Sequence, residues 1–215
     1  MKKRLIMLIL TIILTTQYIL APPKNYPNNY IEYIKSINII RNEQIQDSLE
    51  VNYLKSLKIH SKNFFSKEER KKTREIANYL GIKKVSWLYQ IFYIESRLNP
   101  KVVNTLSGAT GLIQWLPKTA IICGTTTDKL RKMTVIEQLD YVKVYFKLAL
   151  NGKKVNSFLD LYLAVFSPNA IGKSDSFIIG AKNSRVTKLN SSLMNKDSII
   201  TKKDIRLRLV TYILM

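Results

Sequence analysis

The sequence predicts a mostly α-helical fold, and three observations support this prediction. Capping-box patterns, with a serine or threonine three residues before an acidic residue, stand at residues 66–69, 134–137, 157–160 and 201–204. Residue pairs that end helices stand at 80–81, 99–100 and 151–152. No stretch alternates apolar and polar residues for long enough to predict a sheet.

These signals place helices in order along the chain. The expected helices lie at residues 67–80, 83–97, 134–150, 157–166 and from residue 201 onward. Before them, residues 30–65 carry isoleucine and leucine at helical spacings, which predicts one or two modest helices. Residues 112–116 form a short apolar element that Pro117 is expected to stop.

The helix expected at residues 83–97 carries a carboxylate on its apolar side. Leu88, Ile91, Phe92 and Glu95 follow the i, i+3, i+4, i+7 spacing of one helix face. Burial disfavours the charged form of a carboxyl group and raises its pKa, which suits a general acid near neutral pH. The alternative is that Glu95 forms an ordinary ion pair with Arg97 or with another cation.

The N-terminus has the form of a secretory signal. Residues 2–4 are basic and precede an apolar run at residues 5–14. The stretch nearly reaches the length of a bilayer, so an uncleaved membrane anchor at residues 5–20 is an open alternative to a cleaved leader. We expect residues 1–21 to be leader or anchor, 22–65 a proline-containing linker and N-terminal extension, and 66–215 the functional domain.

Charge and composition narrow the classes of partner and cofactor. The formal net charge of +20 favours a polyanionic partner such as nucleic acid, anionic lipid or cell-wall polymer. The alternative is that the basic surface only keeps the protein soluble. No nucleic-acid recognition motif is present, so we expect no such partner. Because Cys123 and His60 are each the single residue of their type, a zinc site is excluded and we expect no metal or other cofactor.

Two motifs in the centre of the chain resemble the signatures of a known enzyme family. Glu95-Ser96 precedes Asn99-Pro100, and after a short spacer residues 108–120 read GATGLIQWLPKTA. The pair resembles the Glu-Ser and Gly-Leu-x-Gln motifs of lytic transglycosylases, in the soluble and phage-type branch of the lysozyme-like superfamily. The resemblance covers residues 66–179, about half of the chain.

The resemblance implies a lysozyme-like helical domain with a central buried catalytic helix. It also implies that Glu95 is the single catalytic acid and later the base. Ser96 would orient the acid and the sugar, Gly111 would allow a tight turn beside the sugar, and Gln114 would bind acetamido and hydroxyl groups. The substrate would be peptidoglycan, cut at the β-1,4 bond between N-acetylmuramic acid and N-acetylglucosamine with a 1,6-anhydro product.

The third family motif, usually Ala-Tyr-Asn-Ala-Gly, is where this sequence departs from the pattern. Phe166 stands at the tyrosine position and Ser167 at the asparagine position. Tyr162 lies one helical turn earlier and could supply a hydroxyl group to the site, or could be an ordinary core residue.

The sequence therefore leads to the expectation of an exported enzyme of the cell envelope, in the periplasm or on the outer face. Two alternatives to a lytic transglycosylase remain at this stage. One is a lysozyme-type hydrolase that acts through Glu95, and the other is a non-catalytic module of the cell wall or of a phage.

Overall fold

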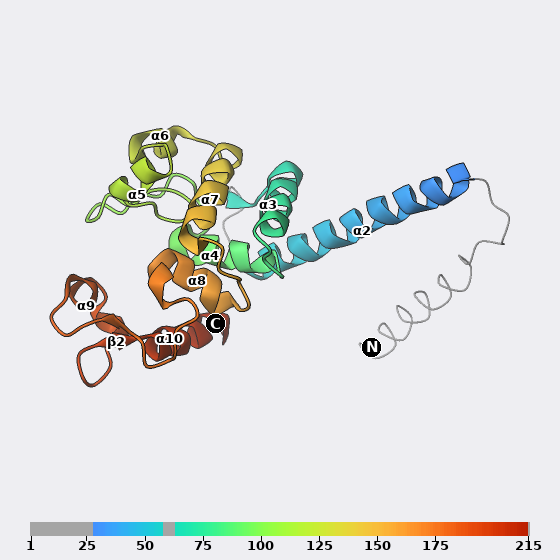
Figure 1. Cartoon of the computed structure of the whole chain (residues 1–215). Coiled ribbons are helices and arrows are strands. Elements are labelled where there is room, and N and C mark those ends of the chain that lie inside the picture. Colours follow the sequence, from blue (N-terminus) through green and yellow to red (C-terminus); the bar gives the residue numbers. More distant parts are fainter. Residues whose placement is uncertain (1–27, 58–62, 215) are drawn as a thin grey trace. The chain divides into compact units, whose positions relative to one another are not determined.

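The computed structural model describes residues 28–57 and 63–214, and this part of the chain is mostly helical, as the sequence predicts (Figure 1). By its contacts the chain divides into two compact units, Met1–Gln46 and Asp47–Met215. The expected leader at residues 1–21 and His60 lie outside the described residues.

Helix α2, Asn28–Ser56, is one helix of 29 residues where the sequence predicted one or two modest helices. In the first unit its isoleucines at positions 37, 39, 40 and 45 are exposed. In the second unit the same helix contributes Leu54 and Glu50 to the interior. Within the described ranges, no helix is both long enough and apolar enough to cross a membrane.

Helix α3, Lys67–Tyr79, begins and ends at the residues that the sequence indicates. The Glu69 backbone N–H donates to Ser66 Oγ at 3.2 Å, and the Ser66 backbone N–H donates to the Glu69 carboxylate at 2.6 Å, which completes a capping box. At the other end, Gly81 has φ +67° and the Ile82 backbone N–H donates to the Ala77 carbonyl at 2.8 Å. This is the left-handed glycine cap expected there.

Helix α4, Ser86–Ser96, places several fully buried side chains in the core. Leu88, Ile91 and Phe92 have no exposed surface, as their shared face predicts. The helix begins later than the predicted residue 83, because residues 82–85 are used to turn the chain after the Gly81 cap. Its C-terminal end, by contrast, falls where the sequence placed it.

The rest of the second unit consists of six further α-helices among the described residues, two single-turn 3₁₀ helices and one small sheet. The α-helices are α5 (Pro117–Ile122), α6 (Thr127–Lys132), α7 (Val135–Leu150), α8 (Phe158–Phe166), α9 (Arg185–Leu189) and α10 (Lys202–Leu214). The 3₁₀ helices are η2 (Pro168–Ala170) and η3 (Ser191–Leu193), and the strands β1 (Ile178–Gly180) and β2 (Ile200–Thr201) pair antiparallel.

These elements confirm some predicted boundaries and correct others. The capping boxes at the starts of α7 and α8 form as predicted, and Asn151 closes α7 in a left-handed conformation. Pro117, however, begins α5 as its first residue, because a proline lacks the N–H that the first turn of a helix cannot use. The sheet was not predicted, since strands of two and three residues are too short to show alternation.

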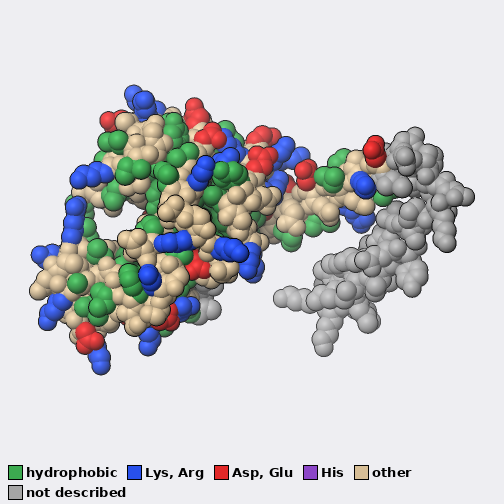
Figure 2. Space-filling view, viewed as in Figure 1, with side chains coloured by type: hydrophobic (Ala, Val, Ile, Leu, Met, Phe, Trp, Pro, Cys, Tyr) green, Lys and Arg blue, Asp and Glu red, His purple; other side chains and the backbone are tan. Residues whose placement is uncertain are grey.

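Helix α7 is the element around which this unit packs. It contacts α3 on one side and α8 on another, and α8 also contacts α4 (Figure 1). The largest fully buried side chains are aromatic: Trp115, Tyr89, Phe65, Phe92 and Phe146. On the face drawn in Figure 2, lysine and arginine side chains are spread over the surface of the unit and outnumber the acidic ones.

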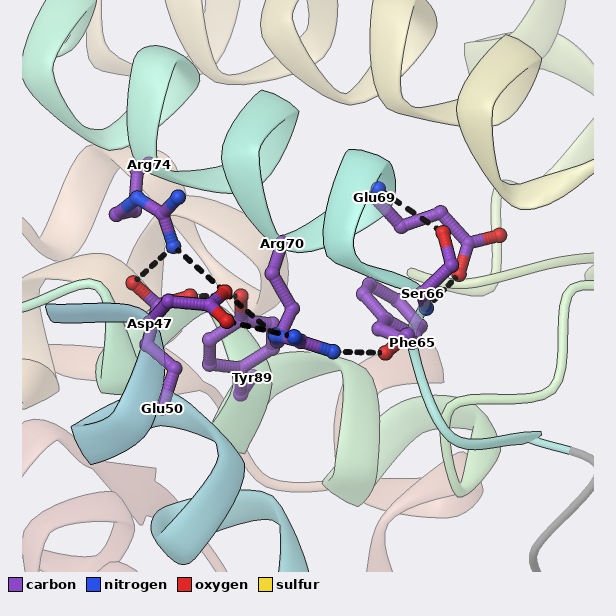
Figure 3. Close-up of polar contacts among 8 residues, drawn as sticks. All are labelled: Asp47, Glu50, Phe65, Ser66, Glu69, Arg70, Arg74 and Tyr89. Carbon is purple, nitrogen blue, oxygen red and sulfur yellow. Dashed lines mark hydrogen bonds and ion pairs between the residues drawn. The ribbon is translucent and has the colours of Figure 1, made fainter. Parts of the chain in front are cut away.

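A polar network joins the second-unit part of α2 to α3 and α4 (Figure 3). Arg70 donates two hydrogen bonds to the Asp47 carboxylate, at 2.9 and 2.8 Å. Arg74 donates to one oxygen of the buried Glu50 at 3.0 Å, and the Tyr89 hydroxyl donates to the other at 2.6 Å. Each oxygen of the buried Glu50 carboxylate therefore accepts a hydrogen bond.

Candidate active site

The Glu95 side chain lies at the C-terminal end of α4 and is half-buried. Among the described residues, no hydrogen bond or salt bridge joins its carboxylate to another side chain. Burial alone raises the pKa of Glu95 from 4.5 to about 7. A carboxyl group with this pKa is partly protonated at neutral pH, so it can donate a proton and later accept one.

The neighbouring arginine does not neutralise this carboxylate. The Arg97 guanidinium lies over the Tyr93 ring, 4.2 Å from the ring centroid, where a cation interacts with the ring face. The simple ion pair with Arg97 that the sequence allowed is therefore not formed.

The backbone just after Glu95 is strained. Arg97 has φ +55° and Leu98 has φ +59°, so two successive residues with side chains adopt the left-handed conformation. Such positions cost of order 1 kcal/mol or more each and are concentrated at functional sites. The sharp turn that they make ends α4 immediately after the acid.

Ser96 fixes the end of α4 to the loop that carries the second motif. Its hydroxyl oxygen is buried, 2.9 Å from the Phe92 carbonyl and 3.0 Å from the Leu112 carbonyl, and its single proton serves both acceptors. The role predicted for Ser96 was to orient the acid and the sugar. Its hydrogen bonds to backbone carbonyls orient the loop beside the acid, and a contact with sugar stays a prediction.

Gln114 lies in the same loop and holds it closed. With φ +51°, its side chain turns back so that Nε2 donates to the Gly111 carbonyl at 3.1 Å and to the Val102 carbonyl at 3.3 Å. Within the described part of the chain, nothing donates to Gln114 Oε1. That oxygen can accept a hydrogen bond from an N–H or O–H group of a ligand.

Gln138 of α7, which was not identified from the sequence as a site residue, holds this loop through hydrogen bonds to backbone groups. Its amide is fully buried; Oε1 accepts from the Leu112 N–H at 2.9 Å, while Nε2 donates to the carbonyls of Pro100 at 2.7 Å and Leu130 at 2.8 Å. Gly111 lies directly against this amide. The predicted tight turn at Gly111 is present, and its immediate neighbour is Gln138.

We expect Gly111→Ala to destabilise the protein by about 3 kcal/mol. A Cβ atom there would lie 2.6 Å from Gln138 Oε1, and that amide cannot move without breaking three hydrogen bonds. Chemical denaturation at equilibrium measures the loss. Gly108→Ala is the matched control, because Gly108 has a similar φ of +71° but a Cβ there would meet Pro117 Cγ at 3.4 Å, an ordinary contact.

The control should lose only the cost of a left-handed alanine, about 1 kcal/mol. Equal losses in the two variants would mean that backbone conformation, and not the Gln138 contact, requires glycine at position 111.

A second residue not identified from the sequence, Tyr145, lies within electrostatic range of Glu95. Burial raises the pKa of the Tyr145 hydroxyl, and the nearby Cys123 and Glu95 raise it further. The hydroxyl donates to the Ala164 carbonyl at 2.9 Å, which ties α7 to α8. Tyr145 also lines a cavity of about 480 Å³ together with residues of α5, of α8 and of the segment after α8, among them Ile122, Val165 and Asn169.

Tyr162, the predicted candidate for a hydroxyl at the site, belongs to a row of aromatic side chains on α8. Its ring stacks on Phe166 with 6.0 Å between centroids and lies 6.5 Å from Phe158. Helices α4 and α8 are in contact, so the structure brings the helix of Tyr162 against the helix of Glu95. A direct role of Tyr162 beside the acid stays a prediction.

The two missed residues left a signal in the sequence. Gln138 and Tyr145 are seven residues apart and lie along one edge of the apolar stripe formed by Leu139, Val142 and Phe146 of the same helix. A polar amide beside an apolar stripe has to be hydrogen-bonded when it is buried. The sequence pattern could therefore indicate that Gln138 is buried and hydrogen-bonded. It could not identify the partners of Gln138, because they lie in segments distant in sequence.

Comparisons with known proteins identify no family for this chain. No protein-family model matches the sequence, and a search of curated proteins finds no match either. In the described part of the structure, no group of three or more histidine, cysteine or acidic side chains is placed to hold a metal ion.

Proposed function

We propose that the protein is an exported peptidoglycan-cleaving enzyme, a lytic transglycosylase that acts through Glu95. The observation that carries this proposal is the half-buried carboxyl group with a pKa of about 7 and no cationic partner among the described residues. Its position supports the proposal further, because the loop with Gly111 and Gln114 is joined to the same helix end through Ser96.

In the proposed reaction Glu95 performs two proton transfers. The protonated carboxyl group gives its proton to the glycosidic oxygen as the bond from that oxygen to C1 of the muramoyl residue breaks. The carboxylate then takes the proton of the muramoyl 6-hydroxyl as that oxygen bonds to C1 and closes the 1,6-anhydro ring. Because the nucleophile belongs to the substrate, a second catalytic carboxylate is not required.

The proposed fold is a lysozyme-like helical domain with α4 as its central catalytic helix. The burial of Leu88, Ile91 and Phe92 supports a central position for this helix, and the hydrogen bond from Ser96 to the Leu112 carbonyl supports a site at its C-terminal end. The basic surface suits a cell wall with peptide carboxylates and anionic polymers, and added salt should weaken that attraction. Whether residues 5–20 also anchor the protein to a membrane is a separate expectation from the sequence.

Digestion of purified sacculi tests the proposed reaction. Wild-type protein should release muropeptides with 1,6-anhydro ends, identified by mass spectrometry, and Glu95→Gln should release them about 10²–10⁴-fold more slowly. Glu75→Gln is a matched control. Glu75 is exposed on α3, so its substitution removes the same charge at a position outside the candidate site. Its products should equal those of the wild type.

The same experiment separates the alternatives. Products with only reducing ends, lost in Glu95→Gln, would replace the transglycosylase with a lysozyme-type hydrolase. Absence of products from every variant would overturn both enzymatic functions and favour a non-catalytic module of the cell wall or of a phage.

A further inference from the structure

A second cavity, of about 570 Å³, lies where the C-terminal ends of α3 and α7 meet the loop at residues 151–156. We call it the lysine cavity. Its lining is Tyr79, Leu80, Gly81, Lys83, Lys147, Leu150, Gly152, Lys153, Lys154, Val155 and Asn156. Four of these residues are lysines and none is acidic, so the cavity is cationic without internal neutralisation.

The lysines of this cavity are not engaged by acidic side chains. Lys153 Nζ donates to the Pro168 carbonyl at 2.9 Å, which is an uncharged acceptor. Among the described residues, Lys83, Lys147 and Lys154 form no side-chain hydrogen bond or salt bridge. The ammonium group of Lys143, which does not line the cavity, lies 4.0 Å from the centroid of the Tyr79 ring.

The shape of the lysine cavity concentrates these charges. Leu150 and Val155 are buried and form an apolar part of the lining, whereas the lysines are exposed. Long lysine stems can lie along such apolar surface and keep their ammonium groups in water. Several like charges around one concave site raise the local concentration of an anion and favour a multivalent one.

The residue types of the cavity suit phosphate. Among the described residues, no arginine lines the cavity, so recognition would depend on lysine point charges and not on the two-pronged contact that arginine makes with carboxylate or phosphate. Lysine ammonium groups act as compact point charges that suit phosphate oxygens. In addition, the backbone N–H groups of Gly152 and Lys154 donate to no described residue, so they can serve the same anion.

We propose that the lysine cavity binds a phosphate-bearing ligand. Lys153 lines both this cavity and the one beside Tyr145, so the two sites adjoin at that residue. The anion site does not require that Glu95 cleave a glycan, and it goes beyond the proposed function.

Isothermal titration of the full-length protein with inorganic pyrophosphate at low salt tests the proposal. The triple variant Lys83→Gln, Lys147→Gln, Lys154→Gln should bind pyrophosphate at least about 10-fold more weakly than wild type. The matched control is Lys182→Gln, Lys188→Gln, Lys196→Gln, which removes the same charge from exposed positions elsewhere in the unit. It should stay within about 3-fold of wild type.

Two further arms use other anions. Citrate, a carboxylate anion, should bind more weakly than pyrophosphate. Vesicles of phosphatidylglycerol identify the source of the phosphate. If wild-type protein sediments with the vesicles and the triple variant of the cavity lysines does not, the ligand is a lipid headgroup. If wild-type protein binds pyrophosphate but does not sediment with the vesicles, the ligand is a soluble or polymer-borne phosphate.

Three results would overturn the proposal: no pyrophosphate binding by wild type, equal weakening in both triple variants, or equal affinity for citrate and pyrophosphate. Thermal melts of the two triples check that neither is unfolded. Glu95→Gln should bind pyrophosphate like wild type, so a failure here is distinguishable from a failure of the proposed catalytic role.

Discussion

Glu95→Gln is expected to lower the rate of glycan cleavage by about 10²–10⁴-fold, the usual contribution of a positioned general acid. Glutamine has nearly the same shape but cannot give up a proton. For the wild type, the rate should fall as the pH rises through about 7, because the carboxyl group then loses the proton that it has to donate. The rate at which soluble muropeptides are released, measured from pH 4 to 9, gives both the loss of rate in the variant and the pH dependence of the wild type.

The same substitution should make the protein more stable at alkaline pH. The pKa of Glu95 is higher in the folded protein than in the unfolded chain, so the contribution of Glu95 to stability is fully present below about pH 4.5 and is lost as the pH rises through about 7. Glutamine does not titrate. Its stability relative to wild type should therefore increase by about 1–3 kcal/mol between pH 4.5 and 8.

Urea unfolding at the two pH values measures this difference. A difference that does not change with pH would show that Glu95 is well solvated, and the main support for its role as the acid would be removed.

Arg74→Ala is expected to destabilise the protein by about 3–5 kcal/mol, the largest loss of stability predicted here. The substitution removes the cation that donates to the buried Glu50 carboxylate, whose pKa burial already raises. A lone charge in the core costs more than the pair contributed. With a total stability of about 5–15 kcal/mol for a typical protein, this loss is a large share. The loss of the free energy of unfolding is measured from the denaturant midpoints of wild type and variant, fitted with a common slope.

An exposed ion pair provides the control for this prediction. Arg206 lies 2.7 Å from Asp175, and both side chains are about half exposed, so Arg206→Ala should cost less than about 1 kcal/mol. A double variant, Glu50→Gln with Arg74→Met, should recover part of the loss because no unpaired charge remains. If Arg74→Ala behaved like Arg206→Ala, water would have to reach Glu50.

Helix starts and ends were predictable from the sequence because they depend on residues close in the chain. The Ser66, Thr134 and Ser157 boxes each act over three residues, and Gly81 acts at its own position. Short helices such as α6 and α9 were missed, since five or six residues carry too little periodicity to be distinguished from loops.

The candidate site was predictable only in part. Glu95, Ser96 and Gln114 stand in local motifs, and their placement on a helix end and its adjoining loop follows from nearby residues. By contrast, Gln138 reaches three backbone groups in separate segments, and Tyr145 of α7 lies within electrostatic range of an acid at the end of α4. The pairing of Asp47 and Glu50 with α3 likewise depends on tertiary contacts that no local pattern encodes.

The two left-handed residues after Glu95 have a consequence for laboratory evolution of this protein. Glycine or asparagine at position 97, whose side chain is exposed, would relax the backbone, and glutamine at position 95 would remove a titrating group from the interior. A library screened for heat resistance alone would therefore enrich changes at the residue proposed to cut glycan and in the turn that follows it. Such a screen should be paired with a plate assay for wall clearing, so that stable but inactive clones are discarded in each round.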